Sequence, residues 1–541
     1  MRTAARRALE RAMTSTQTPR TKLEDLSKED LIARIYALEA QLPPQPSQRR
    51  PQELYPFPFD KHPKRKIALK FCYAGWEYNG LAAQSQPTPL PTVEQVLFDA
   101  LVNTRLVDPV GGMEGCGWSR CGRTDRGVSA AGQVVSLVLR SALGEKPVRP
   151  KNEAVLEPLG GSMFTEGNDE STLPLDIASS GSSRASSPKL AESPKRELAY
   201  IHMINRVLPP TIRVLAWSPV ADTFDARFSC QYRHYKYFFA RGGKIGQGGL
   251  DIAAMRDAAW RLVGEHDFRN FCKLDPSKQI ENFSRRVLGA WIERVDQDKS
   301  GSSPVFQSKQ DGGSDEDIFV FNLKGTAFLW HQVRCIMAVL FLVGSRLESP
   351  SVIDALLHTS STSSKGRLFS DLDSTVAFAS NVPVESKPNY TMADALPLVL
   401  WDCGYNPDDV QWQTDSDVES KDGVVFDRER THNFWYQLYS IWARDRIQAT
   451  MQSYFLRAAE AFYPSPASSQ GMALGTPRTP ADGLVRINTG GGAFRHTTRY
   501  IPILELERGE RAEAANQRWK EGAVGKRKTA KRGVKAEGLD V

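Results

Sequence analysis

The order of strand-like and helix-like segments constrains the fold of this chain more than any other feature of its sequence. In the first segment Ile67, Leu69, Phe71 and Tyr73 occupy alternate positions, as they would along one face of a strand. The segments that follow are a helix around 93–101, a strand at 133–140, a helix around 197–206, and strands at 213–220 and 232–240. This order, strand–helix–strand–helix–strand–strand, is typical of an α+β unit of ferredoxin-like type.

A second series of segments follows the first. Ile252, Met255, Ala259 and Leu262 recur at helical spacing, and Gly264 is placed to end that helix. The remaining segments are strands at 285–295 and 318–324, a strongly apolar helix at about 329–344, and a strand at 396–402. The sequence therefore predicts two α+β units in one chain.

Composition and periodicity divide the chain into four parts. These parts are residues 1–64, with a basic arm, a short coiled-coil-like helix and a Pro-rich linker, then 65–240, 241–405 and 406–541. The last part contains a predicted helix near 434–461, and we expect the rest of it to be mostly extended or disordered with a basic tail. Within the second part, residues 141–196 are rich in Ser, Gly and Pro and lack periodicity, which predicts a disordered insertion.

Several classes of protein are disfavoured by the composition of the 541 residues. No apolar run reaches the roughly 18 residues that a membrane-spanning helix needs, so we predict a soluble protein without a membrane partner. The seven cysteines are an odd number and include no C-x-x-C pair, which argues against both a disulfide framework and a zinc site. We therefore expect no metal.

The two ends of the chain are basic, and the whole chain has a net charge of +7. The start, MRTAARRALERAM, fits a mitochondrial transit sequence and a disordered basic arm equally well. The cluster KRKTAKR at 526–532 fits a nuclear-localisation signal, a tail that binds the RNA backbone, or a solvated end. We predict a location in the nucleus and cytoplasm, and mitochondrial targeting stays open.

The stretch RCGRTDRGVSAAGQVVSL, residues 120–137, carries the sharpest chemical signal. It places Arg123, Thr124 and Asp125 between Gly122 and Gly127, just before a strand, so that a carboxylate is presented on a short loop whose glycines allow close approach of a ligand. Taken alone, the same residues also fit a turn whose Asp and Thr bind their own backbone.

This stretch resembles the G-R-T-D-x-G-V-x-A signature of the TruA family of pseudouridine synthases, and most of all the eukaryotic branch that modifies uridines 38 and 39 of the tRNA anticodon stem-loop. Four further segments are similar to family motifs in the same order: 66–84 (KIALKFCYAGWEYNGLAAQ), 224–240 (FDARFSCQYRHYKYFFA), 325–344 (GTAFLWHQVRCIMAVLFLVG) and 396–405 (LPLVLWDCGY). The resemblance covers about 66–140 and 197–405. It departs at Leu81 and Ala82, where many relatives have Trp and Gln.

The resemblance implies an isomerase that turns uridine into pseudouridine without a cofactor, because the reaction has no net redox change or group transfer. It assigns the catalytic carboxylate to Asp125. Arg334 lies within the apolar helix, where a buried cation needs a partner. The family match makes that partner Asp125, and an ion pair with another acid is the alternative.

Two substrate-binding residues are also implied. Tyr235 matches the family tyrosine that stacks on the target uracil, although its place among Arg233, Tyr237 and Phe239 on one strand face also fits the core. Arg123 matches the arginine that fills the vacated space or holds the flipped nucleotide's phosphate. We expect the two lone histidines nearby, His234 and His331, to be structural or to contact RNA.

The resulting fold prediction is an α+β protein with two ferredoxin-like halves that share a mixed, mainly antiparallel sheet around a central RNA-binding cleft. The predicted function is a tRNA pseudouridine synthase acting at positions 38/39. The partner would be the anticodon stem-loop of tRNA, and a homodimer is compatible with the resemblance, since bacterial relatives are homodimers. The alternatives are a non-catalytic tRNA-binding protein and a synthase for other tRNA positions, which pseudouridine mapping would distinguish.

Overall fold

A computed structural model of the chain describes residues 57–143, 197–242, 249–295, 318–359, 382–415, 417–420, 423–426, 428–460, 462, 485–522 and 526. The chain divides after Pro58, and every element named below lies in the unit Phe59–Val541. Several sequence predictions fall outside the described residues: the basic arm, the coiled-coil-like helix, the Pro-rich linker before residue 57, the insertion except for residues 141–143, and the basic cluster 526–532 except for Lys526.

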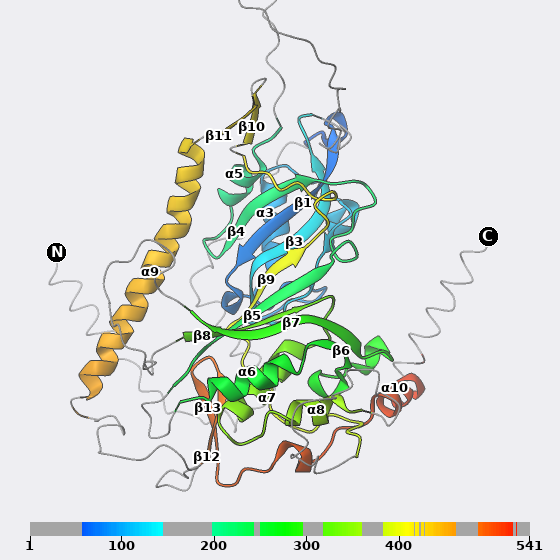
Figure 1. Ribbon diagram of the computed structural model, residues 1–541. Helices are drawn as coiled ribbons and strands as arrows, with labels where there is room; N and C mark the ends of the chain where they lie inside the picture. Colours follow the sequence, from blue (N-terminus) through cyan, green and yellow to red (C-terminus); the bar gives the residue numbers. More distant parts are fainter. Residues whose placement is uncertain are drawn as a thin grey trace, which may run out of the picture. The chain divides into compact units, whose positions relative to one another are not determined.

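One nine-stranded sheet forms the centre of this unit (Figure 1). Its strands are β1 (Lys64–Tyr73), β2 (Ser119–Arg120), β3 (Ser129–Arg140), β4 (Ile212–Pro219), β5 (Tyr232–Ala240), β6 (Gly264–Asp267), β7 (Ser284–Arg294), β8 (Ile318–Gly325) and β9 (Leu398–Gly404). Their order is β4-β1-β3-β9-β5-β8-β7-β6, and β2 also pairs with β3. Neighbours are antiparallel except β3 and β9, which run parallel. The predicted α+β class with a mixed, mainly antiparallel sheet is confirmed.

The two series of strands are joined by β9. In Figure 1 this yellow strand lies between the cyan β3 and the green β5, and it pairs with both. Strand β5, which closes the predicted part 65–240, pairs with β8 from Arg233 to Ala240. One continuous sheet therefore crosses the boundary at residue 240, and the division of the chain into parts stays a prediction.

The described helices include the five that the sequence predicts beyond residue 65 and three that it does not predict. They are α3 (Val93–Asn103), α4 (Gly112–Gly115), α5 (Tyr200–Asn205), α6 (Ile252–Trp260), α7 (Gln332–Gly344), α8 (Val352–Leu357), α9 (Arg428–Glu460) and α10 (Ala512–Glu521). Helix α5 packs on β4, and α6 packs on β7 and α7. No helix in the described part of the chain is both long enough and apolar enough to cross a membrane.

Helix α7 shows why this part of the sequence is apolar on every side. Each of its residues is buried except Arg334, as expected for a helix without a solvent-facing stripe. The helix begins at Gln332, later than the predicted residue 329, because His331 before it has a left-handed backbone with φ 62°. This kink separates Trp330 and His331 from the helix and leaves them in a loop.

Gly264 differs from the prediction. Helix α6 ends at Trp260, and Gly264 is the first residue of the edge strand β6, with φ +126°. A non-glycine residue rarely adopts this backbone conformation, so the glycine serves the entry to a strand and does not end the helix.

The region after residue 405 is more ordered than predicted. It contains two hairpins, β10 (Asp417–Ser420) with β11 (Gly423–Phe426) and β12 (Val485–Gly490) with β13 (Ala493–Thr497), as well as α9 and α10. Strand β12 packs on α7, and Thr489 O accepts a 2.7 Å hydrogen bond from Asp394 N. Residues 485–497 are extended, but they form an ordered hairpin that packs on α7, and the helix α10 was not predicted.

Candidate active site

The loop that carries Asp125 connects β2 to β3 and is held from both sides. On one side the Thr124 hydroxyl lies 2.6 Å from the Tyr73 hydroxyl, and Thr124 O accepts from Leu81 N at 3.2 Å. On the other side Gln133 Nε2 donates to Gly122 O at 2.9 Å. The Thr124 side chain thus binds Tyr73 of β1 and not the backbone of its own turn. The simple-turn alternative is therefore wrong for Thr124.

Arg233 fixes the approach to this loop. Its guanidinium donates to three carbonyl oxygens, those of Cys121 at 2.7 Å, Thr326 at 3.0 Å and Arg227 at 3.1 Å. Hydrogen bonds that involve a charged group are stronger than neutral ones, so this one side chain joins three chain segments beside Gly122. Arg233 was not predicted to be a site residue, although its position two residues before Tyr235 places both on one strand face.

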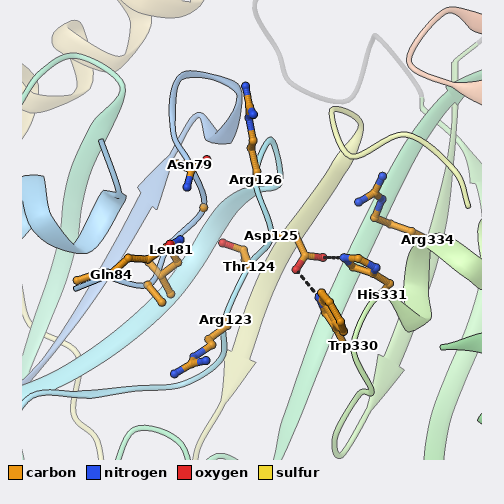
Figure 2. Close-up of a pocket in the computed structure, with 13 residues that line it drawn as sticks. Asn79, Leu81, Gln84, Arg123, Thr124, Asp125, Arg126, Trp330, His331 and Arg334 are labelled. Carbon is orange, nitrogen blue, oxygen red and sulfur yellow. Dashed lines mark hydrogen bonds and ion pairs between the residues drawn. The ribbon is translucent and has the colours of Figure 1, made fainter. Parts of the chain in front are cut away.

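The Asp125 carboxylate, on the loop between β2 and β3, contacts two residues of the loop before α7. Trp330 Nε1 donates to Oδ1 at 3.2 Å, and His331 Nε2 lies 3.4 Å from Oδ2, as the dashed lines of Figure 2 show. Trp330 is 205 residues away along the chain. The simple-turn alternative is therefore also wrong for Asp125, because its carboxylate binds residues of a distant segment.

A cavity of about 450 Å³ opens at this contact. Its walls come from residues 79–84, from the Asp125 loop and from the start of α7, and they include Arg123, Asp125, Arg126, Trp330, His331 and Arg334. The lining contains three arginines and one carboxylate. A volume of this size lies in the range typical of small-molecule sites.

Arg334 lines the cavity but does not form the predicted ion pair. Its Nε donates to Ala393 O at 2.8 Å, and among the described residues it makes no ion pair with Asp125 or with another acid. The physical reason is its position in the first turn of α7, where the segment before β9 offers a carbonyl and where Trp330 and His331 already occupy the carboxylate. The predicted ion pair between Arg334 and Asp125 is therefore wrong, and no other acid replaces Asp125 among the described residues.

The surroundings of His331 lower the pKa of its imidazole. Burial lowers the pKa of this imidazole, Asp125 acts in the opposite direction, and the cations Arg334 and Lys273 lower the pKa further. His234, the other lone histidine, lies elsewhere, with Nε2 3.0 Å from Asn322 Oδ1 between neighbouring strands. The expectation of a structural role fits His234, whereas His331 contacts the candidate catalytic carboxylate.

Tyr235 and Arg123 differ in their access to the cavity. Tyr235 is 9% exposed, packs edge-to-face on Phe328 at 5.1 Å between ring centroids, and is not among the residues that line the cavity. Burial raises the pKa of its phenol well above the ordinary value. Arg123 is exposed and lines the cavity, with its guanidinium turned away from the Asp125 carboxylate (Figure 2). Contacts of either residue with RNA remain predictions.

No group of three or more potential metal ligands is present in the part of the chain that the structure describes. The cavity itself offers one carboxylate, an indole, an imidazole and three arginines.

Several known proteins that are similar to this chain are named tRNA pseudouridine synthases. The family model of tRNA pseudouridine synthases matches residues 258–374. The tRNA pseudouridine(38/39) synthase of Bos taurus is 37% identical over 397 residues, which are 73% of this chain and 64% of that protein. The enzyme of the same name from Saccharomyces cerevisiae is 38% identical over 366 residues, or 67% of this chain and 63% of that protein.

A third relative is covered more fully. A Caenorhabditis elegans protein, named as a probable tRNA pseudouridine synthase, is 35% identical over 357 residues, which are 66% of this chain and 71% of that protein. By contrast, the chain spans less than two thirds of the length of the cattle and yeast proteins.

Proposed function

Because the chain belongs to the TruA family of tRNA pseudouridine synthases, we propose that it converts uridine to pseudouridine in tRNA. The observation that carries this proposal is the Asp125 carboxylate, which lies on a tightly held loop and faces a cavity built from both halves of the sheet. The family relationship rests on overall similarity, and the geometry around Asp125 is compatible with the same reaction.

The reaction breaks the N1–C1′ bond of uridine, turns the uracil, and forms a C5–C1′ bond. The proton on C5 is lost and N1 gains one, so atoms and electrons balance without an oxidant or a donor group. Positive charge develops at C1′ while the first bond breaks, as it does in glycoside cleavage, and a nearby carboxylate stabilises it. We assign this task to Asp125, either by addition to C1′ or by removal of a 2′ proton.

The cavity fits one flipped nucleotide better than a duplex. Its volume of about 450 Å³ is small, so a uridine would have to leave its helical stack to reach Asp125. Arg123 and Arg126 extend to different sides of the cavity in Figure 2, where they could pair with the phosphates on either side of such a nucleotide. Arg334 would then be available for the substrate, since no acid neutralises it among the described residues.

The finer substrate assignment follows from the relatives. Proteins named tRNA pseudouridine(38/39) synthase are 36–38% identical to this chain, which supports action at positions 38 and 39 of the anticodon stem-loop. The homodimer remains a prediction from the resemblance, and the location in the nucleus and cytoplasm remains a prediction from the sequence. Light scattering of the purified protein tests the dimer.

Incubation with unmodified tRNA transcripts, followed by mapping of pseudouridine at each position, tests the proposal. We expect pseudouridine at positions 38 and 39. A protein that binds the transcripts but modifies none would be the non-catalytic RNA-binding alternative, and modification only at other positions would correct the substrate assignment.

A further inference from the structure

Both oxygens of the Asp125 carboxylate are already in contact with ring nitrogens in the free protein. Trp330 supplies one contact at 3.2 Å and His331 the other at 3.4 Å, and each uses a different oxygen. Figure 2 shows the two side chains reaching the carboxylate from the same loop. The arrangement fixes the orientation of the carboxyl plane as well as its position.

The two donors are themselves held in place. Their rings lie 4.5 Å apart at 38°, and Lys273 binds Trp330 twice, with its backbone N 3.0 Å from Trp330 O and its ammonium 5.0 Å from the indole centroid. His331 O accepts the first hydrogen bond of α7, from Cys335 N at 3.0 Å. A side chain supported in this way keeps its geometry without help from substrate.

The backbone of His331 has a left-handed conformation just before α7. Its φ of 62° is uncommon for a residue other than glycine, and among other residues Asn, Asp and His adopt it most readily. Strain of this kind persists where the surrounding structure fixes it, and it is frequent at functional sites.

The state of the imidazole follows from its contacts. Nε2 faces a carboxylate oxygen, which can only accept, so Nε2 carries the proton. Nδ1 is buried and has no hydrogen-bond partner among the described residues, so a second proton there would be left without an acceptor. His331 is thus suited to donate one hydrogen bond as a neutral group, without taking the carboxylate's charge.

We propose that Trp330 and His331 are positioning residues that hold the Asp125 carboxylate in the orientation required at C1′ of the uridine, Trp330 by a hydrogen bond to Oδ1 and His331 by its 3.4 Å contact with Oδ2. This inference rests on the proposed function. The two donors spread the negative charge over both oxygens and prevent rotation of the carboxyl group. They also join the two halves of the sheet at the reacting group.

Two substitutions at His331 separate this role from a purely structural one. His331→Gln keeps an N–H donor at about the reach of Nε2, whereas His331→Asn suits the left-handed backbone but is too short for the same contact. A positioning role predicts that Asn lowers kcat by about tenfold or more, which is about 1.4 kcal/mol, with little change in KM for tRNA. Gln should retain most of the activity. A structural role predicts the reverse order, with Asn the better tolerated.

Trp330→Phe provides the second test. It removes the N–H but keeps a ring against His331 and Lys273, so kcat should again fall about tenfold while the melting temperature stays within a few degrees. Trp401→Phe is the matched control, because Trp401 is similarly exposed (44% against 41%) and lies under Lys236 at 4.6 Å without contacting Asp125. Equal kcat values for the two variants would overturn the proposal.

A readout without catalysis separates this inference from the proposed function. In ¹⁵N NMR of the histidines, the His331 signal is the one that disappears in His331→Gln, among eight histidines in the chain. We expect a neutral ring protonated at Nε2 near pH 7, with shifts that change in Asp125→Asn. A charged ring would refute the neutral state assigned to His331, and shifts that ignore Asp125→Asn would refute the contact, even if the protein makes pseudouridine. Wild-type protein without activity but with the expected shifts would refute the proposed function instead.

Discussion

Glu94 offers the sharpest stability test, because a fully buried carboxylate there joins three segments around the cavity. Its side chain is 0% exposed and lies in the first turn of α3, where a negative charge is favourable. It accepts from Arg120 Nε at 2.5 Å, Trp118 Nε1 at 2.8 Å and Ala83 N at 2.9 Å. Ala83 belongs to the cavity wall, so Glu94 connects the stability of the fold to the shape of the site.

Replacement of Glu94 by Ala should lower the free energy of unfolding by about 3–5 kcal/mol, the usual result of removing one member of a buried ion pair. The loss strands the Arg120 guanidinium, which is only 25% exposed, and two further donors. Glu94→Gln keeps an acceptor oxygen and should cost less, about 1–3 kcal/mol. The melting temperature of the Ala variant should fall by roughly 4 °C or more.

The assay is urea unfolding followed by circular dichroism, together with thermal melts. Asp99→Ala is the control, because Asp99 lies on the same helix but is exposed and binds only Gln95 across one turn, so its removal should change the free energy by less than about 0.5 kcal/mol. A Glu94→Ala protein that unfolds within about 1 kcal/mol of wild type would show that this network does not stabilise the fold.

Three further predictions concern pH, packing and the substrate base. Burial alone would raise the pKa of Glu197, but hydrogen bonds from two backbone N–H groups and a serine hydroxyl lower this pKa overall. The stability that Glu197 contributes is therefore lost as pH falls below about 4.3, and the free energy of unfolding from urea titrations should depend less on acid pH in Glu197→Gln. Gly490→Ala would bring a Cβ within 2.0 Å of the Tyr237 hydroxyl oxygen at φ +84°, so it should unfold about 1–3 kcal/mol more easily than Gly492→Ala, whose site at φ +80° is open; equal stability would contradict the packing of β12 on the core. If Tyr235 stacks on the uracil, Tyr235→Leu should lower turnover more than the melting temperature and Tyr235→Phe should bind tRNA almost normally, whereas a parallel loss of turnover and stability in the Leu variant would assign it to the core.

The strands and helices of the sheet could be predicted because burial leaves a local pattern. The alternation from Ile67 to Tyr73 became β1, and the apolar run before Gly344 became α7. The hairpin β12–β13 was missed, although Asn488 and the glycines 490–492 between two short runs are a turn signal, with positive φ at all three glycines. Its stability comes from α7 and from Asp394, contacts that no local pattern contains.

The candidate site could be predicted only in part, for a similar reason. Asp125 stood out because its loop carries a long family motif, and the structure brings it into one cavity with Arg123 and Arg334. Its actual partners, Trp330 and His331, were not predicted, because the contact spans more than 200 residues and depends on the left-handed backbone of His331. Periodicity predicts which face of an element is buried, but it does not predict which distant side chain meets a given carboxylate.

The measurement that tests the central claim most directly is pseudouridine mapping on unmodified tRNA transcripts treated with wild-type protein and with Asp125→Asn, alongside the affinity of both for the same RNA. We expect the wild type to form pseudouridine at positions 38 and 39. The Asn variant should form none while binding tRNA with little change, because binding is spread over many phosphate contacts and the bond chemistry depends on one carboxylate. Measurable turnover by purified Asp125→Asn protein would contradict the assignment of Asp125 as the catalytic group.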